Sequence, residues 1–440
     1  MSLTSRVRAA DGAGARSGFG GALGLDELKD GMQSFVSVDD LAVMMRDNPS
    51  RARNEIRSAC RQVFEGEAWA DVPEGRREEL AGQLVDEVLG FGPLEPLLAD
   101  DAVTEIMVNG PEEVYFEKEG KLRRSAQRFA DADQLRALID RVLGPLGRRV
   151  DEASPLVNAR LPEGHRVHVV IPPLALDGPV MTVRKFAKRV MTLEDMMGMG
   201  SFDGAMRRFL VWAVRARKSI AVSGGTGSGK TTLLNALSCV LPEGERIITI
   251  EDSAELRFLE HAHVVRLEAR PRNAEGMGEV TIRDLVINAL RMRPDRIVVG
   301  ECRGAEALDM LQAMNTGHDG SLTTLHANSP ADVVARLTTM VRYAVDLPVD
   351  VIEANVAGAF DVVVQTARSL DGSRFVSEVA ELAFDDERRR CGTRTLFRRD
   401  VSDEEGRWLA PPRWLGELCR KGLAMEEEVE SWRYAARLAA

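Results

Sequence analysis

A glycine-rich segment near the middle of the chain constrains the fold more strongly than any other feature. Residues 224–231 read GGTGSGKT and match the phosphate-loop pattern G-x-x-x-x-G-K-[ST] at every fixed position. A short apolar run, residues 219–223, precedes the segment. Apolar residues at helical spacing follow it: Leu233, Leu234, Leu237, Val240 and Leu241. A strand, a glycine turn and a helix in this order can surround a phosphate with backbone N–H groups, which disfavours the alternative of a turn that binds nothing.

We therefore expect the segment to bind the phosphates of a nucleoside triphosphate. Lys230 is expected to reach the β- and γ-phosphates, and the Thr231 hydroxyl is expected to hold Mg²⁺. The other contacts would come from backbone N–H groups and from the first turn of the helix. The predicted nucleotide-binding residues are Gly224, Gly225, Thr226, Gly227, Ser228, Gly229, Lys230, Thr231 and Thr232.

Length and composition limit the classes of protein to which the chain can belong. At 440 residues it is too long for one ordinary hydrophobic core, so two or three domains are expected. The formal net charge of −11 argues mildly against nucleic acid as the main partner. Five scattered cysteines without a C-x-x-C pair suit a reducing cytosol. No apolar run approaches the roughly 18 residues of a membrane span, and residues 1–23 lack the apolar core of a secretory signal.

Changes in pattern along the chain predict a tail, a linker and three folded segments. We expect a disordered tail over residues 1–24, a helical appendage over 25–90 and a smaller α/β domain over 91–188. A linker over 189–200 would lead to the phosphate-loop domain over 201–440. Strands and helices alternate in this domain, which predicts an α/β fold with a mainly parallel sheet, followed by a hairpin and a terminal helix.

The period of the apolar residues predicts individual strands in both α/β segments. In the smaller domain we expect strands at 105–108, 114–118, 167–171 and 181–184, and a helix at 132–143. In the phosphate-loop domain we expect strands at 220–223, 247–251, 264–267, 297–300, 322–326, 361–365 and 375–382.

Charged and polar residues stand at the carboxyl ends of three strands besides the one before the phosphate loop. They are Glu251 and Asp252 on one strand, Glu301 on the next and His326 on a third. Because ligands of open α/β sheets bind at the carboxyl ends of parallel strands, we expect these groups beside the phosphate loop. Each has a plainer alternative: a helix cap for Glu251 and Asp252, a surface ion pair for Glu301, and a core histidine for His326.

Glycine occupies the position at which phosphate-loop enzymes usually place an aspartate, at the end of an apolar strand. Here the strand ends in Gly300, and Glu301 follows it. We therefore predict that Glu301 activates the attacking water, with Glu251 and His326 as further catalytic candidates. Thr231, Glu251 and Asp252 are the predicted residues of the Mg²⁺ site, because Mg²⁺ prefers oxygen ligands beside a nucleotide.

At these residues the chain resembles the superfamily of secretion and type IV pilus ATPases, and within it the tight-adherence (Flp) pilus group, TadA/CpaF. The resemblance is carried by FGPLEPLLADDAVTEIMVNGPEEVYFEKEGKL from Phe91 and AVSGGTGSGKTTLLNALS from Ala221. It continues with ITIEDSAELR from Ile248 and INALRMRPDRIVVGECRGAEALDMLQAMNTGHDGSLTTLHANSP from Ile287. The tetracysteine zinc segment of the type II secretion and pilin-extension relatives is absent, which favours the tight-adherence or type IV secretion branch.

The resemblance implies roles for several of these segments. Residues 250–255 correspond to the family's Asp box, Gly300 and Glu301 to its Walker B motif, and residues 316–326 to its His box. It also implies a RecA-like ATPase domain over residues 201–440, with ATP and Mg²⁺ bound next to the N-terminal domain.

The family brings arginines from the N-terminal domain to the phosphates. By motif these would be Arg166 in GHRV and Arg184 in TVRKF, with Arg160 as a third, and a guanidinium can neutralise charge on the transferring phosphoryl group. The sequence departs from the family here, because the usual acidic residue before the motif is Asn158 and the usual DGSR reads EGHR. The alternative is that they are ordinary surface arginines.

The resemblance further implies a homo-hexameric ring that turns ATP hydrolysis into domain movement. Such a ring would work in the cytoplasm at the inner face of the cell membrane, docked on inner-membrane platform proteins of a pilus or secretion system. No nucleic-acid partner is expected. Two alternatives stay open from the residues: a nucleic-acid translocase on the same RecA-like core, and a nucleotide-gated switch that hardly turns over.

Overall fold

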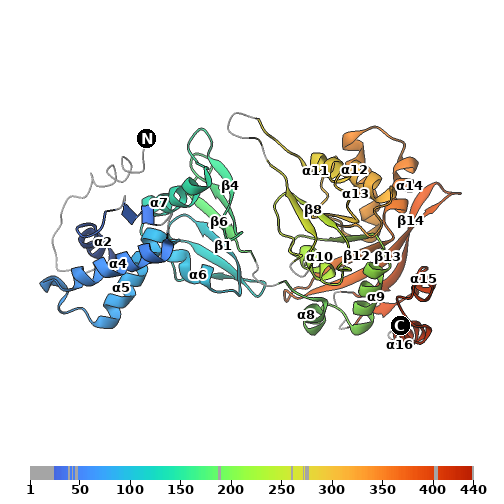
Figure 1. Cartoon of the computed structure of the whole chain (residues 1–440), viewed down its shortest axis with the longest axis horizontal. Helices are drawn as coiled ribbons and strands as arrows, with labels where there is room; N and C mark the ends of the chain where they lie inside the picture. The colour runs from blue at the N-terminus through green and yellow to red at the C-terminus, as the bar shows by residue number, and fades with distance from the viewer. Residues whose placement is uncertain are drawn as a thin grey trace. The chain divides into compact units, whose positions relative to one another are not determined.

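The computed structural model describes residues 24–37, 40–41, 43–44, 48–186, 190–258, 261–270, 272, 277–400 and 405–438. The tail that we expected over residues 1–24 lies outside them, except for Gly24. The chain divides into two compact units, Met1–Ala187 and Lys188–Ala440 (Figure 1). The first unit includes both the helical segment and the smaller α/β segment that the sequence predicted as separate parts.

The helical segment of the first unit has an apolar core of its own. It contains α2 (Leu25–Gln33), α4 (Pro49–Phe64), the short 3₁₀ helix η1 (Glu67–Trp69) and α5 (Glu74–Leu89). Helix α4 begins after Asn48, whose side chain accepts a hydrogen bond from Arg51 N. Buried side chains from all four helices meet in the core, among them Leu28, Ile56, Trp69, Leu80 and Leu84.

An antiparallel sheet and one long helix form the α/β part of the first unit. The strands are β1 (Val103–Asn109), β2 (Val114–Lys118), β3 (Lys121–Arg124), β4 (Leu156–Arg160), β5 (Arg166–Val170) and β6 (Val180–Arg184). Short helices η2 (Gly92–Leu94), α6 (Glu95–Ala99) and η3 (Gly144–Leu146) and the longer α7 (Ala132–Leu143) complete it. The six strands follow the order β3-β2-β1-β6-β5-β4, and apolar residues of the sheet and of α7 share one core. The expected strands and helix are confirmed, whereas β3 and β4 were missed because their side chains show little apolar alternation.

A nine-stranded sheet forms the centre of the second unit. Its strands are β7 (Ile220–Gly224), β8 (Ile247–Glu251), β9 (Val264–Glu268), β10 (Arg296–Val299), β11 (Leu322–Leu325), β12 (Val362–Arg368), β13 (Arg374–Asp385), β14 (Arg390–Arg398) and β15 (Arg407–Trp408). Their order is β15-β14-β13-β12-β7-β11-β10-β8-β9. The strands from β12 to β9 pair in parallel, as predicted, but β13, β14 and β15 pair antiparallel. The expected C-terminal hairpin therefore extends the main sheet, which makes the sheet mixed.

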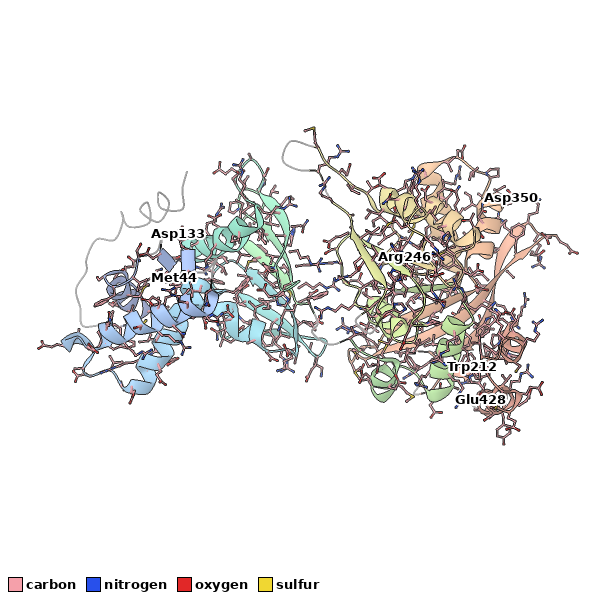
Figure 2. All side chains as sticks on the ribbon, viewed as in Figure 1. Met44, Asp133, Trp212, Arg246, Asp350 and Glu428 are labelled. Atoms are coloured by element: carbon pink, nitrogen blue, oxygen red, sulfur yellow. The ribbon has the colours of Figure 1, made fainter. Side chains whose placement is uncertain are left out.

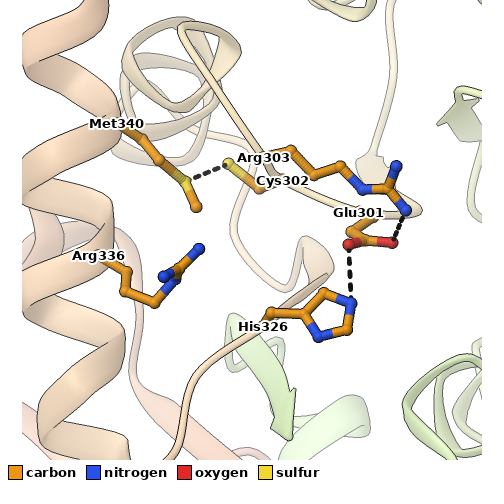
Figure 3. A pocket seen from close by; sticks show the side chains of 6 residues that line it. All are labelled: Glu301, Cys302, Arg303, His326, Arg336 and Met340. Carbon is orange, nitrogen blue, oxygen red and sulfur yellow. Dashed lines mark hydrogen bonds and ion pairs between the residues drawn. The ribbon is translucent and has the colours of Figure 1, made fainter. Parts of the chain in front are cut away.

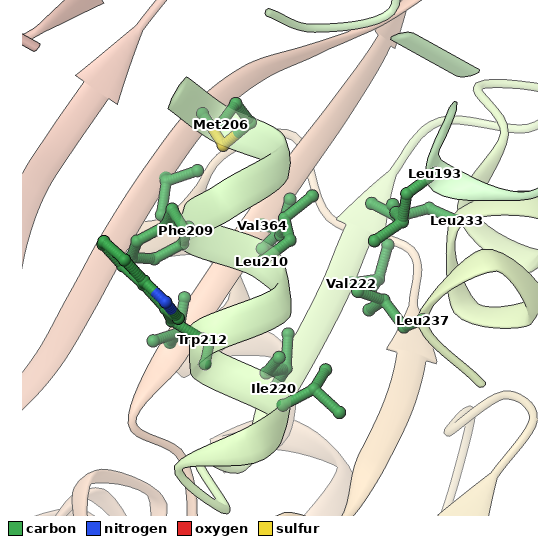
Figure 4. Close-up of a cluster of buried hydrophobic side chains, with 14 of the residues drawn as sticks. Leu193, Met206, Phe209, Leu210, Trp212, Ile220, Val222, Leu233, Leu237 and Val364 are labelled. Atoms are coloured by element: carbon green, nitrogen blue, oxygen red, sulfur yellow. The ribbon is translucent and has the colours of Figure 1, made fainter. Parts of the chain in front are cut away.

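Helices cover both faces of this sheet and enclose two cores. One core contains residues of α8 (Leu193–Gly198), α9 (Gly204–Arg215), α10 (Lys230–Ser238), α15 (Leu415–Arg420) and α16 (Glu426–Leu438). The other contains residues of α11 (Ile282–Ala289), α12 (Glu306–Asn315), α13 (Pro330–Ala344) and α14 (Val349–Ala359). Strand β7 serves both, because Ile220 and Val222 face the first core and Ala221 faces the second (Figure 4). A strand buried on both faces reads as a continuous apolar run, which is why the sequence predicted it.

Aromatic side chains attach the C-terminal segment to the first of these cores. Trp432 of α16 lies with its ring centroid 4.7 Å from that of Trp408 and 6.2 Å from that of Trp212, which Figure 2 labels on α9. The indole N–H of Trp432 donates to the Ala205 carbonyl at 2.8 Å. The terminal helix is therefore packed into the unit as part of its core.

Candidate nucleotide-binding site

Four parallel strands place their carboxyl ends at one edge of the large sheet. Strand β11 pairs with β7 so that Leu325 lies opposite Ser223, and β8 pairs with β10 so that Ile250 lies opposite Val299. The residues that follow these positions are therefore brought to the same edge. The structure thus brings together the phosphate loop, the Asp-box segment, Glu301 and His326, as expected for groups that follow parallel strands of one sheet.

Contacts with the neighbouring strand β12 hold the phosphate loop in its conformation. Gly224 has φ 152°, and a Cβ atom on it would lie 2.5 Å from Ser228 Oγ and from Thr366 O. Only glycine fits such a conformation with backbone this close. The Ser228 and Thr366 hydroxyls form a hydrogen bond of 2.8 Å, and Thr366 Oγ1 donates to Ser223 O at 3.1 Å. The loop therefore keeps its curvature through contacts within this unit.

Lys230 begins α10 and is buried inside the loop. Its Nζ donates to the carbonyl oxygens of Gly224 at 3.0 Å and Gly225 at 2.8 Å. The same Nζ lies 3.5 Å from His326 Nδ1. Thr231 and Thr232 follow in the first turn of α10 and are partly exposed. The ammonium thus lies between the glycine loop and the imidazole, where a phosphate oxygen could replace its carbonyl partners.

Glu301 forms a charged cluster with His326 and Arg303 (Figure 3). Arg303 Nη2 donates to Glu301 Oε2 at 2.7 Å, and His326 Nε2 lies 3.2 Å from Glu301 Oε1. Burial alone would raise the pKa of the Glu301 carboxyl, but the hydrogen bond and charge of Arg303, together with the charge of Lys230, lower it overall. Burial and the charge of Lys230 lower the pKa of His326. The cluster therefore presents an ionised carboxylate beside a neutral imidazole at neutral pH.

Hydrogen bonds to backbone groups fix the position of this cluster. Thr324 Oγ1 donates to Gly300 O at 2.6 Å, and Cys302 N donates to Thr324 O at 2.9 Å. Glu306 Oε1 accepts hydrogen bonds from Arg303 N at 2.6 Å and from Gly304 N at 2.8 Å. The segment that carries Glu301 is therefore attached both to β11 and to the start of α12.

Glu251 lies at the same edge but is turned into the protein. Its side chain is almost fully buried, and its Oε1 accepts hydrogen bonds from Glu255 N at 2.7 Å and Leu256 N at 2.9 Å. Burial raises the pKa of this carboxyl to about 7. The contacts in the structure bind the Asp-box segment to the sheet, while the predicted catalytic and metal-binding roles of Glu251 stay predictions.

Asp252 points to the surface next to the Glu301 cluster. Its side chain is 66% exposed, and its Oδ2 lies 3.8 Å from Arg303 Nη1. Among the described residues, no group of three or more His, Cys, Asp or Glu side chains could hold a metal ion. A Mg²⁺ ion at this edge would therefore depend on nucleotide oxygens and waters together with one or two protein oxygens, which is how Mg²⁺ is usually bound beside nucleotides.

The predicted arginines of the first unit lie side by side on its sheet. Arg166 opens β5 and is the register partner of Arg184 on β6 and of Arg160 on β4. Arg184 Nε lies 3.5 Å from Glu105 Oε1. The three guanidinium groups therefore form one basic row, and their approach to phosphates stays a prediction.

A cavity of about 310 Å³ opens behind the Glu301 cluster. Its lining residues are Glu301, Cys302, Arg303, His326, Arg336 and Met340, and Figure 3 shows Arg336 of α13 extending toward His326. Cys302 Sγ lies 3.8 Å from Met340 Sδ. Burial raises the pKa of the Cys302 thiol well above its usual value. The thiol therefore stays protonated, and Cys302 lines the cavity without acting as a nucleophile.

Sequence reasoning missed several residues of this edge. Arg303 stands two positions after Glu301, and nothing in the spacing alone indicates that its side chain turns back to the carboxylate. Arg368 could have been found, because it ends the parallel strand β12 and so reaches the same edge as the other four strands.

The sequence over residues 87–394 matches the family of type II/IV secretion system proteins. The chain belongs to this family. A protein of Mycobacterium tuberculosis (strain ATCC 25618 / H37Rv) whose name refers to conjugal transfer is 42% identical over 305 residues, which cover 68% of this chain and 86% of that protein.

Two solved structures of ATPases are similar to the chain. The VirB11 ATPase of the Brucella suis type IV secretion system is 32% identical and covers 66% of this chain and 95% of its own, with a TM-score of 0.37. The Legionella pneumophila ATPase DotB is 22% identical, covers 78% of this chain and 95% of its own, and has a TM-score of 0.50. Membership of this family implies ATP hydrolysis in a secretion system.

None of the helices in the described part of the chain is both long and apolar enough to cross a lipid bilayer.

Proposed function

We propose that the protein is a Mg²⁺-dependent ATPase motor of a tight-adherence (Flp) pilus or a type IV secretion system. The observation that carries the proposal is the cluster of Lys230, His326 and Glu301 at the phosphate-loop edge. Lys230 Nζ lies 3.5 Å from His326 Nδ1, and His326 Nε2 lies 3.2 Å from Glu301 Oε1. The buried Lys230 ammonium and the ionised Glu301 carboxylate lie on opposite sides of the His326 imidazole. In this arrangement Lys230 can bind a phosphate while Glu301 orients a water molecule.

Each residue of the cluster has a defined task in this proposal. Lys230 exchanges its carbonyl partners for β- and γ-phosphate oxygens. Glu301 accepts a hydrogen bond from the attacking water and orients it, because Arg303 keeps the carboxylate ionised. His326 is neutral, so one ring nitrogen can accept a hydrogen bond while the other donates, and it keeps Lys230 and Glu301 at a fixed separation.

Oxygen atoms at this edge fit a magnesium ion bound with the nucleotide. Thr231 in the first turn of α10 and the exposed Asp252 would hold it, with Glu251 as a ligand only if its carboxylate turned away from the Glu255 and Leu256 amides. When bound, Mg²⁺ neutralises charge on the β- and γ-phosphates.

We further propose that the second unit is a RecA-like motor domain in a homo-hexamer. Motion of the motor would be transmitted to inner-membrane platform proteins from the cytoplasmic side of the membrane. Within the ring, Arg166 and Arg184 would neutralise charge on the phosphates. The match to secretion relatives supports the motor, and the absence of a C-x-x-C pair supports the tight-adherence or type IV secretion branch.

Steady-state ATP hydrolysis by the purified full-length chain tests the proposal. Lys230→Ala should abolish hydrolysis, and Glu301→Gln should lower kcat by about 10²–10⁴-fold while ATP remains bound. Matched controls are Lys121→Ala on β3 and Glu430→Gln on α16, whose side chains are exposed. Chelation of Mg²⁺ should stop hydrolysis, and DNA should not stimulate it. Full activity of Glu301→Gln, or strong stimulation by DNA or RNA, would contradict the proposal.

A further inference from the structure

The hairpin of β12 and β13 brings two arginines to the carboxyl edge of the large sheet. Arg368 ends β12 and Arg374 begins β13, and the two residues are register partners. Strand β12 runs parallel to β7 with Thr366 opposite Gly224. Arg368 therefore stands two residues beyond the first glycine of the phosphate loop, at the level of the loop itself.

The turn between these arginines is closed by its own hydrogen bonds. Ser369 N donates to Ser373 O at 2.8 Å, and Gly372 N donates to Ser369 O at 3.0 Å. Asp371 Oδ1 accepts hydrogen bonds from Ser373 N at 2.9 Å and Ser373 Oγ at 2.7 Å. The turn thus keeps the two arginines at a fixed spacing, and the carboxylate of Asp371 is engaged within it.

Both arginines border the phosphate loop. A Cβ atom on Gly227 would lie 3.4 Å from Arg368 Nη1. A Cβ atom on Gly229 would lie 3.5 Å from Arg374 Cδ, so the stem of Arg374 passes close to the last glycine before Lys230. The hydrogen bond between Thr366 and Ser228 attaches this side of the loop to β12. The hairpin and the loop therefore form one surface.

The order of the strands separates two sides of this surface. Lys230, His326 and Glu301 stand toward β11 and β10, whereas the hairpin stands on the other side of β7. If the γ-phosphate of a bound triphosphate lies between Lys230 and Glu301, its α-phosphate is the phosphate farthest from Glu301. On that far side, the side chains of Arg368 and Arg374 lie beside the loop glycines Gly227 and Gly229.

We propose that Arg368 and Arg374 bind the α-phosphate of the nucleotide and thereby set the affinity for both ATP and ADP. The inference rests on the proposed ATPase function and adds a second cationic site to it. A guanidinium forms charge-assisted hydrogen bonds to phosphate oxygens, and two held on a closed hairpin lose little conformational freedom when they do so. ATP and ADP share the α-phosphate, so the two arginines contribute equally to the affinity for both nucleotides. Only ATP has a γ-phosphate, so the contacts near Glu301 discriminate ATP from ADP.

Binding of fluorescent ADP and of ATP to the full-length chain tests the inference. Arg368→Ala and Arg374→Ala should each raise the Kd for ADP about tenfold, the size expected for loss of one charged hydrogen bond. The Kd for ATP in the Glu301→Gln background should rise by the same factor, so the ratio of the two affinities stays constant. In steady state, KM should rise about tenfold while kcat falls far less.

Controls separate this inference from a general loss of structure and from the function itself. Arg398→Ala, on β14 of the same sheet and 57% exposed, should leave both Kd values unchanged. If Arg374→Ala fails to fold, Arg374→Gln replaces it, and Arg374→Lys should recover part of the affinity. An unchanged Kd for ADP in the folded variants, or a loss confined to ATP, would overturn the inference. Wild-type protein that bound no nucleotide would instead overturn the proposed function.

Discussion

Glu251 fills the space that a side chain at position 300 would need. A Cβ atom on Gly300 would lie 2.7 Å from Glu251 Cγ, which is shorter than a carbon–carbon contact allows. The glycine at the position where phosphate-loop enzymes usually carry an aspartate is therefore explained by packing. The Glu251 side chain from β8 passes across the end of β10, and Glu301 is the first side chain after β10 that can reach the edge.

Gly300→Ala should therefore destabilise the protein through Glu251. Overpacking of this kind costs about 1–3 kcal/mol of unfolding free energy, measured by urea denaturation. Glu251→Ala should be less destabilising in the Gly300→Ala background than alone, because it removes the overlapping side chain. Gly198→Ala is the matched control, since a Cβ there would meet no atom within 4 Å. Strict additivity of the two substitutions would contradict the packing relationship.

Arg303→Gln should shift the pH profile of hydrolysis. Arg303 lowers the pKa of the Glu301 carboxyl through its hydrogen bond and its charge, so its loss raises that pKa. A carboxylate with a higher pKa is ionised over a smaller range, and the acidic limb of kcat/KM should move to higher pH. Arg342→Gln on α13, which pairs with Asp346, should leave the profile in place. A shift toward lower pH would refute the role assigned to Arg303.

Trp432→Ala should remove the attachment of the terminal helix. Trp432 is 2% exposed, packs edge-to-face against Trp408 and donates to Ala205 O. Loss of a buried aromatic side chain costs about 3–5 kcal/mol, which urea denaturation of the second unit would detect. Tyr434→Ala, two residues away and 67% exposed, should change stability far less. Equal effects of the two substitutions would mean that α16 does not contribute to the core.

Asp86→Asn should stabilise the protein at neutral pH. Burial, and after it the charge of Glu95, raises the pKa of Asp86 in the folded state. The folded state therefore binds the proton more tightly than the unfolded chain, so stability is highest below the ordinary aspartate pKa and falls as pH rises through the raised value. Asparagine does not ionise, so the variant does not lose stability as pH rises through this range. Its advantage over wild type should be absent in acid and appear at neutral pH, whereas exposed Asp177→Asn should show no such trend.

The strands that carry the site could be predicted because they are buried on both faces. Strands β7, β8 and β10 read as short apolar runs, and the groups at their carboxyl ends follow directly in the sequence. Strands β3 and β4 lie at the edges of the smaller sheet, where their side chains are exposed or half-buried, so they carry no apolar period to detect. The antiparallel addition of β13 to β12 was also hidden, because an apolar run does not state the direction of its neighbour.

The local order of residues determined that a phosphate loop, two acidic segments and a histidine would meet at one edge, since parallel strands of one sheet end together. Only the tertiary structure decided what each group does there. Arg303 turns back to Glu301, Glu251 turns inward against Gly300, and the hairpin of β12 and β13 brings Arg368 and Arg374 to the loop. These outcomes depend on side-chain direction and on contacts between segments far apart in the chain, which no pattern along a single strand contains.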